Sequence, residues 1–429
     1  MKRFKTICVL SLLLLIVIAL PVSAKTITIW TGFPELEPFY KWAGEEFARN
    51  HPGVNVEVLS TSLREFEQKL VTSIPTGTGP DIFDVGPYIA IKLIDAGLLP
   101  ENPEDLDGFL KSGAWSDFAV DYVTVGDYTY GLPLMNGSRA ALFYNKDMFV
   151  EAGLDPDKPP ATLTELMEYA RKLTTYDAAG NIVRSGLSLR ISGGGSGLTE
   201  KFRFILNNFG GDLIVPTADG KWKNGLNNEA GHKALQFYVD ALHKYRVDAP
   251  EVRHDSDAFV TEMTAMFLRE SWVIGEIKAK NPGLNYGVAP MPAEERWETL
   301  AQPWCIYMSL EGAEREEVRE LMKFMASAEA APMLIELSGW IPEREFDYAA
   351  LLAETPQYEV FVNPPEGLGF YADPVIPAFD EIQTRVADEL MAAFLDKSLV
   401  DNPDGIAKVM NDIANLVDSI LKMYDAYGE

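Results

Sequence analysis

Hydrophobic and polar residues follow a regular order of strand and helix patterns along the first part of the chain. The stretch KTITIWTGF alternates Ile27 and Ile29 with threonine, as a half-buried strand does, and VNVEVLS and DIFDV are two further strand patterns. Apolar residues between these strands recur at helical spacing, as Leu36, Phe39 and Phe47 do. The order βαβαβα predicts a parallel sheet covered by helices.

A second unit begins near YGLPLMNGSRAALFYNKDMF. Its helix TLTELMEYARKLT starts with a capping box, in which Thr162 is the cap and Glu165 follows three residues later. The sequence contains no internal repeat, low-complexity tract or flexible linker, so we expect the chain to pass between the units within ordered segments. The pattern after this helix predicts strands near 186–191, 213–215 and 264–268 and helices near 198–209, 228–245 and 271–280.

Residues 1–24 have the pattern of a secretory signal peptide. MKRFK supplies positive charge, TICVLSLLLLIVIALP is the apolar segment, and VSA is a cleavage site that ends at Ala24. The alternative is an uncleaved membrane anchor, which the short run and Pro21 disfavour. Cleavage removes Cys8 and leaves Cys305 alone, so no internal disulfide is expected. Because no cysteine follows the cleavage site, we expect a secreted protein that is free in the periplasm, without a lipid anchor.

Composition narrows the class of protein. The chain has 429 residues, of which 47% are hydrophobic and 24% are charged, as in globular proteins of two or three domains. The formal net charge of −27 is distributed along the whole chain. Such an acidic surface disfavours nucleic acid and anionic lipid as partners.

Catalytic and metal motifs are incomplete. The histidines His51, His232, His243 and His254 do not form a set with the spacing of metal ligands. GGGSG lacks the second glycine of a nucleophile elbow, GTGPDI lacks the lysine of a phosphate loop, and DNPDG is not a complete calcium loop. We therefore predict no catalytic residue, metal or cofactor. A secreted glycoside hydrolase stays open as an alternative, because a pair of carboxylates can always be nominated in so acidic a chain.

Several blocks of the mature chain together resemble one family. In order, they are ITIWTG, HPGVNVEV, GTGPDIFDV, YGLPLMNGSRAALFYNKDMFVEAGLDPDKPPATLTEL, AMFLRESWVIGEI, NYGVAPMP and LMKFMASAEAAPML. Behind a signal peptide, this series resembles the family 1 extracellular solute-binding proteins of ABC importers. The resemblance covers nearly the whole mature chain.

The resemblance implies an α/β fold of the type II periplasmic binding protein class, with two lobes and a ligand cleft between them. The implied lobes are 25–136 plus 298–340 and 137–297 plus 341–429, joined by crossing segments near 134–140, 290–300 and 339–345. Ligands of open α/β sheets bind beyond the carboxyl ends of strands, and hinge closure would trap the solute there.

The candidate ligand-binding residues are polar or aromatic residues at predicted strand ends and crossings. Trp272 directly follows an apolar strand, so its ring is expected to stack on the ligand, although burial as ordinary core is the alternative. The roles of its neighbours Arg269 and Glu270, as loop anchors or as contacts to ligand hydroxyls, stay open. The full set is Phe33, Glu35, Ser62, Arg64, Asp84, Tyr88, Asn136, Ser138, Arg139, Gly194, Gly195, Trp272, Trp304, Trp340, Tyr371, Asp373 and Asp380.

Aromatic rings beside carboxylates, amides and arginines suit a sugar, which has apolar C–H faces and hydroxyl edges. The resemblance implies a non-catalytic, monomeric receptor that delivers a carbohydrate to the membrane permease of an ABC transporter. A receptor of the same fold for a polyol, a glycerol phosphate or a peptide is the alternative.

Overall fold

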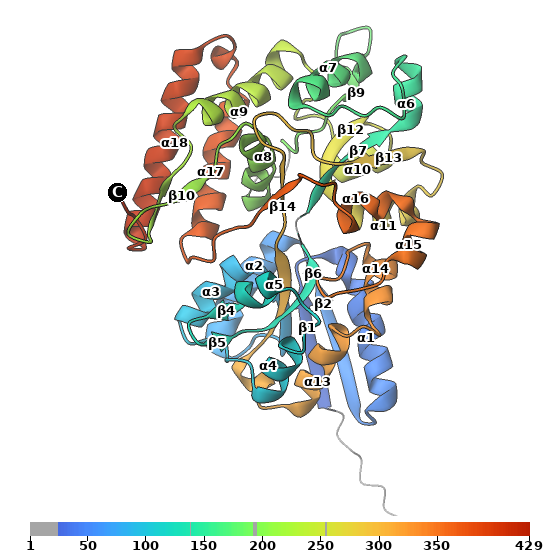
Figure 1. Ribbon diagram of the computed structural model, residues 1–429, viewed down its shortest axis with the longest axis vertical. Coiled ribbons are helices and arrows are strands. Elements are labelled where there is room, and N and C mark those ends of the chain that lie inside the picture. Colours follow the sequence, from blue (N-terminus) through green and yellow to red (C-terminus); the bar gives the residue numbers. More distant parts are fainter. Residues whose placement is uncertain (1–24, 138, 192–194, 254) are drawn as a thin grey trace, which may run out of the picture.

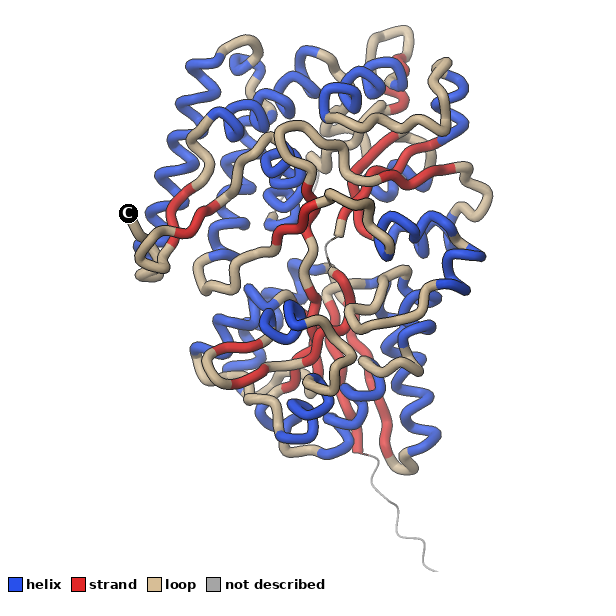
Figure 2. The backbone as a smooth tube through the Cα atoms, in the orientation of Figure 1, coloured by secondary structure: helices blue, strands red, loops and turns tan. Residues whose placement is uncertain are grey.

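The computed structural model describes residues 25–137, 139–191, 195–253 and 255–429, which form two α/β lobes with a narrow waist (Figure 1). Helices surround the strands of each lobe (Figure 2). Among the described residues, no helix has the length and apolar character needed to cross a membrane. The predicted signal peptide lies outside the described part of the chain.

The first lobe contains a five-stranded sheet with the order β2-β1-β3-β15-β6. The first three strands along the chain pair in parallel as predicted, but β15 runs antiparallel to both β3 and β6. The sheet is therefore mixed, because its last two strands come from the crossing segments rather than from βαβ units. The strands are β1 (Lys25–Thr31), β2 (Val54–Ser60), β3 (Ile82–Val85), β6 (Leu132–Asn136) and β15 (Pro303–Met308).

Helices and one hairpin cover this sheet. Helix α1 buries Phe39, Ala43 and Phe47 on one face, which is the periodicity read from the sequence. The helical elements are η1 (Pro34–Leu36), α1 (Glu37–Asn50), α2 (Leu63–Ser73), η2 (Ile74–Thr76), α3 (Pro87–Asp95), α4 (Glu104–Leu110), α5 (Asp117–Tyr122), α12 (Leu310–Ala313), α13 (Glu316–Met325) and α14 (Ala331–Ser338). The hairpin consists of β4 (Thr124–Val125) and β5 (Tyr128–Thr129).

The second lobe is built on an antiparallel sheet with the order β12-β7-β13. The strand predicted near 186–191 is replaced by an extended segment, which forms only isolated bridges, from Ser185 to Thr264 and from Ser188 to Phe267 of β12. The sheet strands are β7 (Ala140–Asn145), β12 (Met266–Glu270) and β13 (Tyr286–Ala289). Further pairs are β8 (Thr175–Tyr176) with β9 (Ile182–Arg184), β10 (Ile214–Pro216) with β11 (Trp222–Asn224), and β14 (Glu298–Leu300) with β16 (Gly369–Tyr371).

The helices of the second lobe include the capping box expected at Thr162. Its hydroxyl accepts from the Glu165 N–H at 3.0 Å, and the Glu165 carboxylate accepts from the Ala161 N–H at 2.8 Å. The helices are α6 (Lys146–Glu151), α7 (Leu163–Leu173), α8 (Ser196–Asn208), α9 (Glu229–Val239), η3 (Asp240–Lys244), α10 (Asp255–Val260), α11 (Trp272–Lys280), α15 (Ala349–Glu354), η4 (Pro356–Tyr358), α16 (Glu359–Val362), α17 (Phe379–Phe394), η5 (Lys397–Leu399) and α18 (Pro403–Met423).

Three segments lie side by side at the waist. The Asn136 N–H donates to Ile341 O and the Gly137 N–H donates to Gln302 O, each at 3.0 Å. The predicted lobe limits shift accordingly. Residues 298–300, assigned to the first lobe from the sequence, pair with β16, and Thr299 bonds both backbone groups of Ala140. Residues 341–345, assigned to the second lobe, bond instead to Leu134 and Ala114 of the first lobe. Backbone hydrogen bonds between distant segments set these limits, and the hydrophobic periodicity of a sequence does not reveal such bonds.

Candidate functional site

Five of the aromatic residues singled out from the sequence form one row of rings between the lobes. The ring centroids lie 6.2 Å apart for Tyr88 and Trp304, and 4.9 Å apart for Trp304 and Phe33. Phe33 lies 6.2 Å from Trp340, which lies 6.4 Å from Trp272. We call these five residues the ring row. Only Trp272 comes from the second lobe, so the row joins the two lobes.

Local sequence places each ring at the end of an element. Phe33 follows β1 and precedes η1, while Tyr88 lies in the first turn of α3. Trp340 follows the left-handed Gly339 that ends α14, and Trp272 is the first residue of α11. Within the described residues, the indole N–H groups of Trp304 and Trp340 are buried without a hydrogen-bond partner. Two unused donors beside aromatic faces suit a ligand that carries hydroxyl groups.

Glu35 brings a carboxyl group to the row from the first lobe. Burial raises the pKa of Glu35 from an ordinary 4.5 to about 7, although the positive charge of Arg269 acts in the opposite direction. The Trp340 indole N–H also acts to lower the pKa of this carboxyl group. The charge of Arg269 in the second lobe therefore acts on Glu35 in the first lobe.

Glu270 answers the question that the sequence left open about the neighbours of Trp272. Its buried carboxylate accepts from the Trp272 indole N–H at 3.1 Å and pairs with Arg269 at 3.2 Å and with Lys201. Burial acts to raise the pKa of Glu270, but the charges of Arg269 and Lys201 outweigh it and hold the pKa below its ordinary value. Glu270 is thus a loop anchor, and the Arg269 guanidinium lies 4.9 Å from the centre of the Trp272 ring.

Asp84 lies beneath the row at the end of β3 and is only 1% exposed. Its carboxylate accepts from the Tyr40 hydroxyl at 2.8 Å. Burial raises the pKa of Asp84 to about 7, while hydrogen bonds from Thr31 and Tyr40 lower it and the nearby charge of Glu35 raises it further. In this arrangement Asp84 supports the row from within the first lobe.

Asp373 and Tyr371 lie in a buried network rather than along the row. The Asp373 carboxylate pairs with Arg203 and accepts from Gln302 at 3.1 Å and Gln383 at 3.2 Å. The Arg203 guanidinium also lies 5.4 Å from the Tyr371 ring centre. Protein groups therefore already satisfy the Asp373 carboxylate, which ties a crossing segment to α8 and α17.

Asp380 forms an ion pair between the lobes. Its carboxylate lies 2.7 Å from the Lys92 ammonium group, so α17 of the second lobe contacts α3 of the first. Phe379, the residue before Asp380, lies 6.0 Å from the Tyr88 ring. The ion pair therefore adjoins the Tyr88 end of the ring row.

The other candidates lie apart from the row or outside the described residues. Asn136 and Arg139 line a cavity of ≈ 710 Å³ at the hinge together with Glu343, whose pKa burial raises to about 7. Ser62 is exposed at the start of α2, and Gly195 directly precedes α8. The Arg64 side chain, Ser138 and Gly194 lie outside the described part of the structure.

Some residues of the junction escaped the sequence analysis. Lys201 and Arg203 are buried charged residues of α8, and both pair with carboxylates. Tyr122 was also missed, and its hydroxyl donates to Gln302 Oε1 at 2.8 Å. The alternation of charged and aromatic residues in KFRF could have indicated these buried charges. A helix turn that packs its aromatic residues in the core also buries the charged residues between them. Across the described residues, no cluster of histidine, cysteine and acidic side chains could hold a metal ion.

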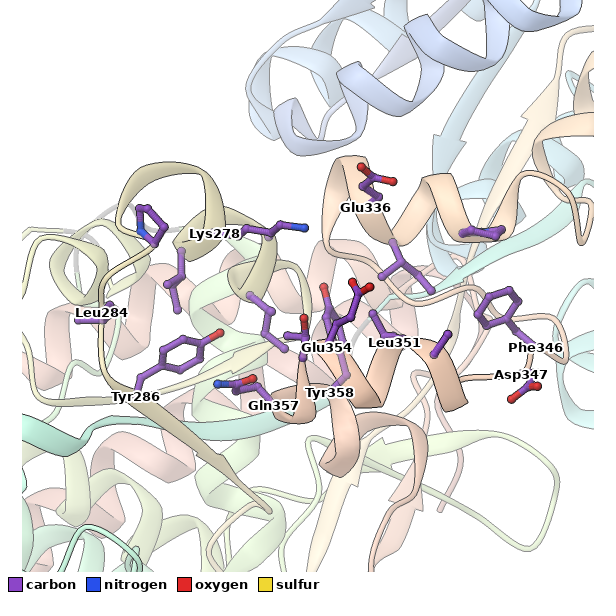
Figure 3. A pocket seen from close by; sticks show the side chains of 18 residues that line it. Lys278, Leu284, Tyr286, Glu336, Phe346, Asp347, Leu351, Glu354, Gln357 and Tyr358 are labelled. Carbon is purple, nitrogen blue, oxygen red and sulfur yellow. The ribbon is translucent and has the colours of Figure 1, made fainter.

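A separate cavity of ≈ 620 Å³ lies between α11, α14, α15 and η4 (Figure 3). Ile277, Ile335 and Leu351 contribute apolar walls, while Lys278 and Glu336 bring charges. None of the five rings of the ring row lines this cavity. The row and this cavity are therefore separate, although both adjoin α11 and α14.

The fold agrees with that of known proteins. The family model of the bacterial extracellular solute-binding proteins matches residues 31–332, and the chain belongs to this family. A binding protein from Brucella abortus (strain 2308) is 24% identical over 401 residues, covering 90% of each chain. The maltotriose-binding protein of Pyrococcus abyssi is 26% identical over 271 residues, which cover 62% of this chain and 53% of that protein.

Solved structures show the same two-lobed architecture. An ABC transporter solute-binding protein from Thermotoga lettingae TMO, bound with α-D-tagatose, aligns with a TM-score of 0.77 and 26% identity. The alignment covers 92% of this chain and 100% of that one. A maltose-bound protein of T. maritima aligns with a TM-score of 0.76 at 22% identity, over 93% of this chain and 100% of that one, and supports the fold. The fold is therefore that of the type II periplasmic binding proteins, as the sequence predicted.

Proposed function

We propose that this protein is a non-catalytic receptor that binds a carbohydrate between its lobes and delivers it to the permease of an ABC transporter. The ring row is the observation that carries the proposal. Aromatic faces match the C–H faces of a sugar, and the indole N–H groups and Glu35 offer hydrogen bonds to its hydroxyl groups. Relatives that bind maltotriose, lactose or mannitol support this choice of ligand class.

The charges at the junction favour a neutral ligand over an anionic one. Arg269, which lies beside the Trp272 ring, and Lys201 both pair with the Glu270 carboxylate. A phosphate group would have to compete with that buried carboxylate for the same cations. The receptor is expected to act as a monomer after export from the cytoplasm, with 1–24 as its signal peptide.

Thermal unfolding with a panel of sugars, polyols, glycerol 3-phosphate and peptides tests the ligand class. A ligand that binds only the folded protein raises its melting temperature by mass action, and we expect a saccharide to give the largest rise. A larger rise with glycerol 3-phosphate or a peptide would contradict the proposal. Turnover of a chromogenic glycoside by the pure protein would favour the hydrolase alternative.

The Trp272→Ala variant tests the site. We expect saccharide binding to weaken by about 1–3 kcal/mol, the range for a central aromatic contact, while the fold is retained. Calorimetric titration gives the affinity, and Trp222→Ala, a half-buried tryptophan of β11, is the matched control. Equal loss in both variants, or no loss in Trp272→Ala, would place the ligand elsewhere.

A further inference from the structure

Contacts between the lobes close the ring row at the Tyr88 end. Tyr88 and Lys92 are four residues apart in α3 and therefore share one face of the helix. On that face, Tyr88 contacts Phe379 at 6.0 Å between ring centres, and Lys92 pairs with Asp380 at 2.7 Å. Both partners belong to the first turn of α17. The aromatic row thus ends at an ion pair that spans the two lobes.

The Trp272 end of the row is closed by backbone. Gly275 of α11 packs against Gly339 at the end of α14, so closely that a Cβ atom on Gly275 would lie 2.9 Å from the Gly339 Cα atom. These helices belong to different lobes, and their contact directly adjoins the Trp272 and Trp340 rings. Contacts between the lobes therefore lie at both ends of the row.

We infer that Lys92 and Asp380 limit the length of the saccharide that the closed receptor takes, so that its ligand is a short one. This inference rests on the proposed function. A sugar unit that extends past Tyr88 must separate two opposite charges whose side chains are only 31% and 27% exposed. Such a unit would also have to supply a donor to the Asp380 carboxylate and an acceptor for the Lys92 ammonium group in place of the direct pair.

The residue types support a closing role over a ligand contact. The Asp380 carboxylate could accept hydrogen bonds from a sugar if it were unpaired. Its Oδ2 atom, however, already accepts from the Lys92 ammonium group. The pair bridges helices of different lobes, so it forms only when the lobes approach. It therefore contributes to closure around ligands that fit and opposes closure around ligands that protrude.

The experiment measures affinity by calorimetry along the series glucose, maltose, maltotriose and maltohexaose, and along the corresponding mannose and cellulose series. For the wild-type protein we expect affinity to fall up to about fivefold once the chain exceeds the preferred length, because the Lys92–Asp380 pair is then separated. In Asp380→Ala, the ratio of long-chain to short-chain affinity should rise by up to about fivefold. Lys92→Met, which keeps most of the apolar stem, should raise the same ratio and replaces Asp380→Ala if that variant does not fold.

Lys323→Ala is the matched control, because Lys323 pairs with Asp105 at 2.8 Å at similar exposure, within the first lobe. Its length ratio should equal that of the wild type. Equal affinity for long and short chains in the wild-type protein would overturn the inference. An unchanged length ratio in both Asp380→Ala and Lys92→Met would also overturn it. Either result would leave the receptor function in place. Failure of every saccharide to bind any variant would overturn the proposed function and the inference with it.

Discussion

Two of the contacts between the lobes differ in chemistry and in position. The α3–α17 contact depends on the half-exposed Lys92–Asp380 ion pair, whereas the α11–α14 contact is apolar and brings Gly275 against Gly339. Gly339 lies two residues before Ile341, whose carbonyl accepts from Asn136 at a crossing segment. The glycine contact is therefore beside the hinge, and the ion pair is carried by helices away from the crossings.

This difference indicates which contact opens. A rotation about a hinge moves atoms near the axis least and distant atoms most. The glycine contact is also strengthened by Ile335, a residue of α14 that is buried in the small core around α11. We expect the α11–α14 contact to act as a pivot that persists, and the ion pair to break when the cleft opens.

The largest effect is expected from Ile335→Ala, which creates a cavity on the pivot side. Ile335 is 5% exposed and packs in the cluster that contains Ile274 and Phe361. Loss of the buried methyl and methylene groups should lower the free energy of unfolding by about 2–5 kcal/mol, measured by urea denaturation. Val71→Ala, at a position 64% exposed, is the control. Equal effects of the two substitutions would show that Ile335 of α14 does not pack in the small core around α11.

The next effect is expected from Gly275→Ala, which adds a Cβ atom against the Gly339 backbone. A side chain can turn away from such a clash, but a backbone Cα atom at 2.9 Å can move only if the helices separate. We expect a loss of about 1–3 kcal/mol, as for overpacking, and a larger radius of gyration by small-angle X-ray scattering in the presence of ligand. Gly283→Ala, which meets open space, should change neither quantity. A normal radius of gyration would contradict the pivot.

A smaller, pH-dependent effect is expected from Glu35, whose carboxyl group interacts with Trp340. Because burial raises its pKa from 4.5 to about 7, the folded protein binds this proton more tightly than the unfolded chain does. The free energy of unfolding should therefore fall as pH rises through the interval from 4.5 to about 7. In Glu35→Gln the fall should be shallower, and at pH ~8 the variant should be more stable than the wild type by on the order of 1 kcal/mol.

Urea denaturation at several pH values between ~5 and ~8 measures this effect across the interval in which the Glu35 proton is lost. Asp84 and Glu343 also have raised pKa values, so part of the slope should persist in the variant. Glu57→Gln, at an exposed position of β2, serves as the control. A parallel shift of the whole curve, without a change of slope, would contradict this role of Glu35.

The smallest effect is expected from the ion pair itself. A double-mutant cycle on Lys92 and Asp380 should give a coupling of about 0.2–1 kcal/mol in the ligand-free protein, because half-exposed pairs gain little over their hydration. The coupling should weaken as salt concentration rises, since counterions screen exposed charges. A coupling that exceeds the effect of Ile335→Ala would reverse the roles assigned to the two contacts.

Much of the fold could be predicted from local sequence patterns, because each such pattern favours one type of secondary structure. Alternation in KTITIWTGF predicted a strand, helical spacing of Phe39 and Phe47 predicted α1, and Thr162 with Glu165 predicted a helix start. The prediction of a strand near 186–191 was wrong, because this segment forms only isolated bridges with the neighbouring segment. Periodicity reports which side of a segment is buried, but not how many backbone bonds it makes.

The candidate site divides in the same way. Aromatic residues at strand ends could be singled out from the sequence, and five of them meet in the ring row. Charged residues such as Asp373 and Asp380 were predicted as ligand contacts, but their partners could not be identified, because those partners lie far apart in the chain. Asp380 pairs with Lys92, and Asp373 pairs with Arg203. A sequence shows that a carboxylate is present, but its nearest cation is a property of the folded chain.

The sequence by itself determined the class of fold, the family and the position of Trp272 at the exit of a buried strand. The tertiary structure decided that Glu270 anchors Trp272, that Trp272 faces Trp340 of the other lobe, and that an ion pair ends the row. The physical reason is the distance along the chain over which each kind of interaction acts. Propensity and periodicity act over a few residues, whereas a binding site between lobes is made by electrostatic and packing contacts between segments that only folding brings together.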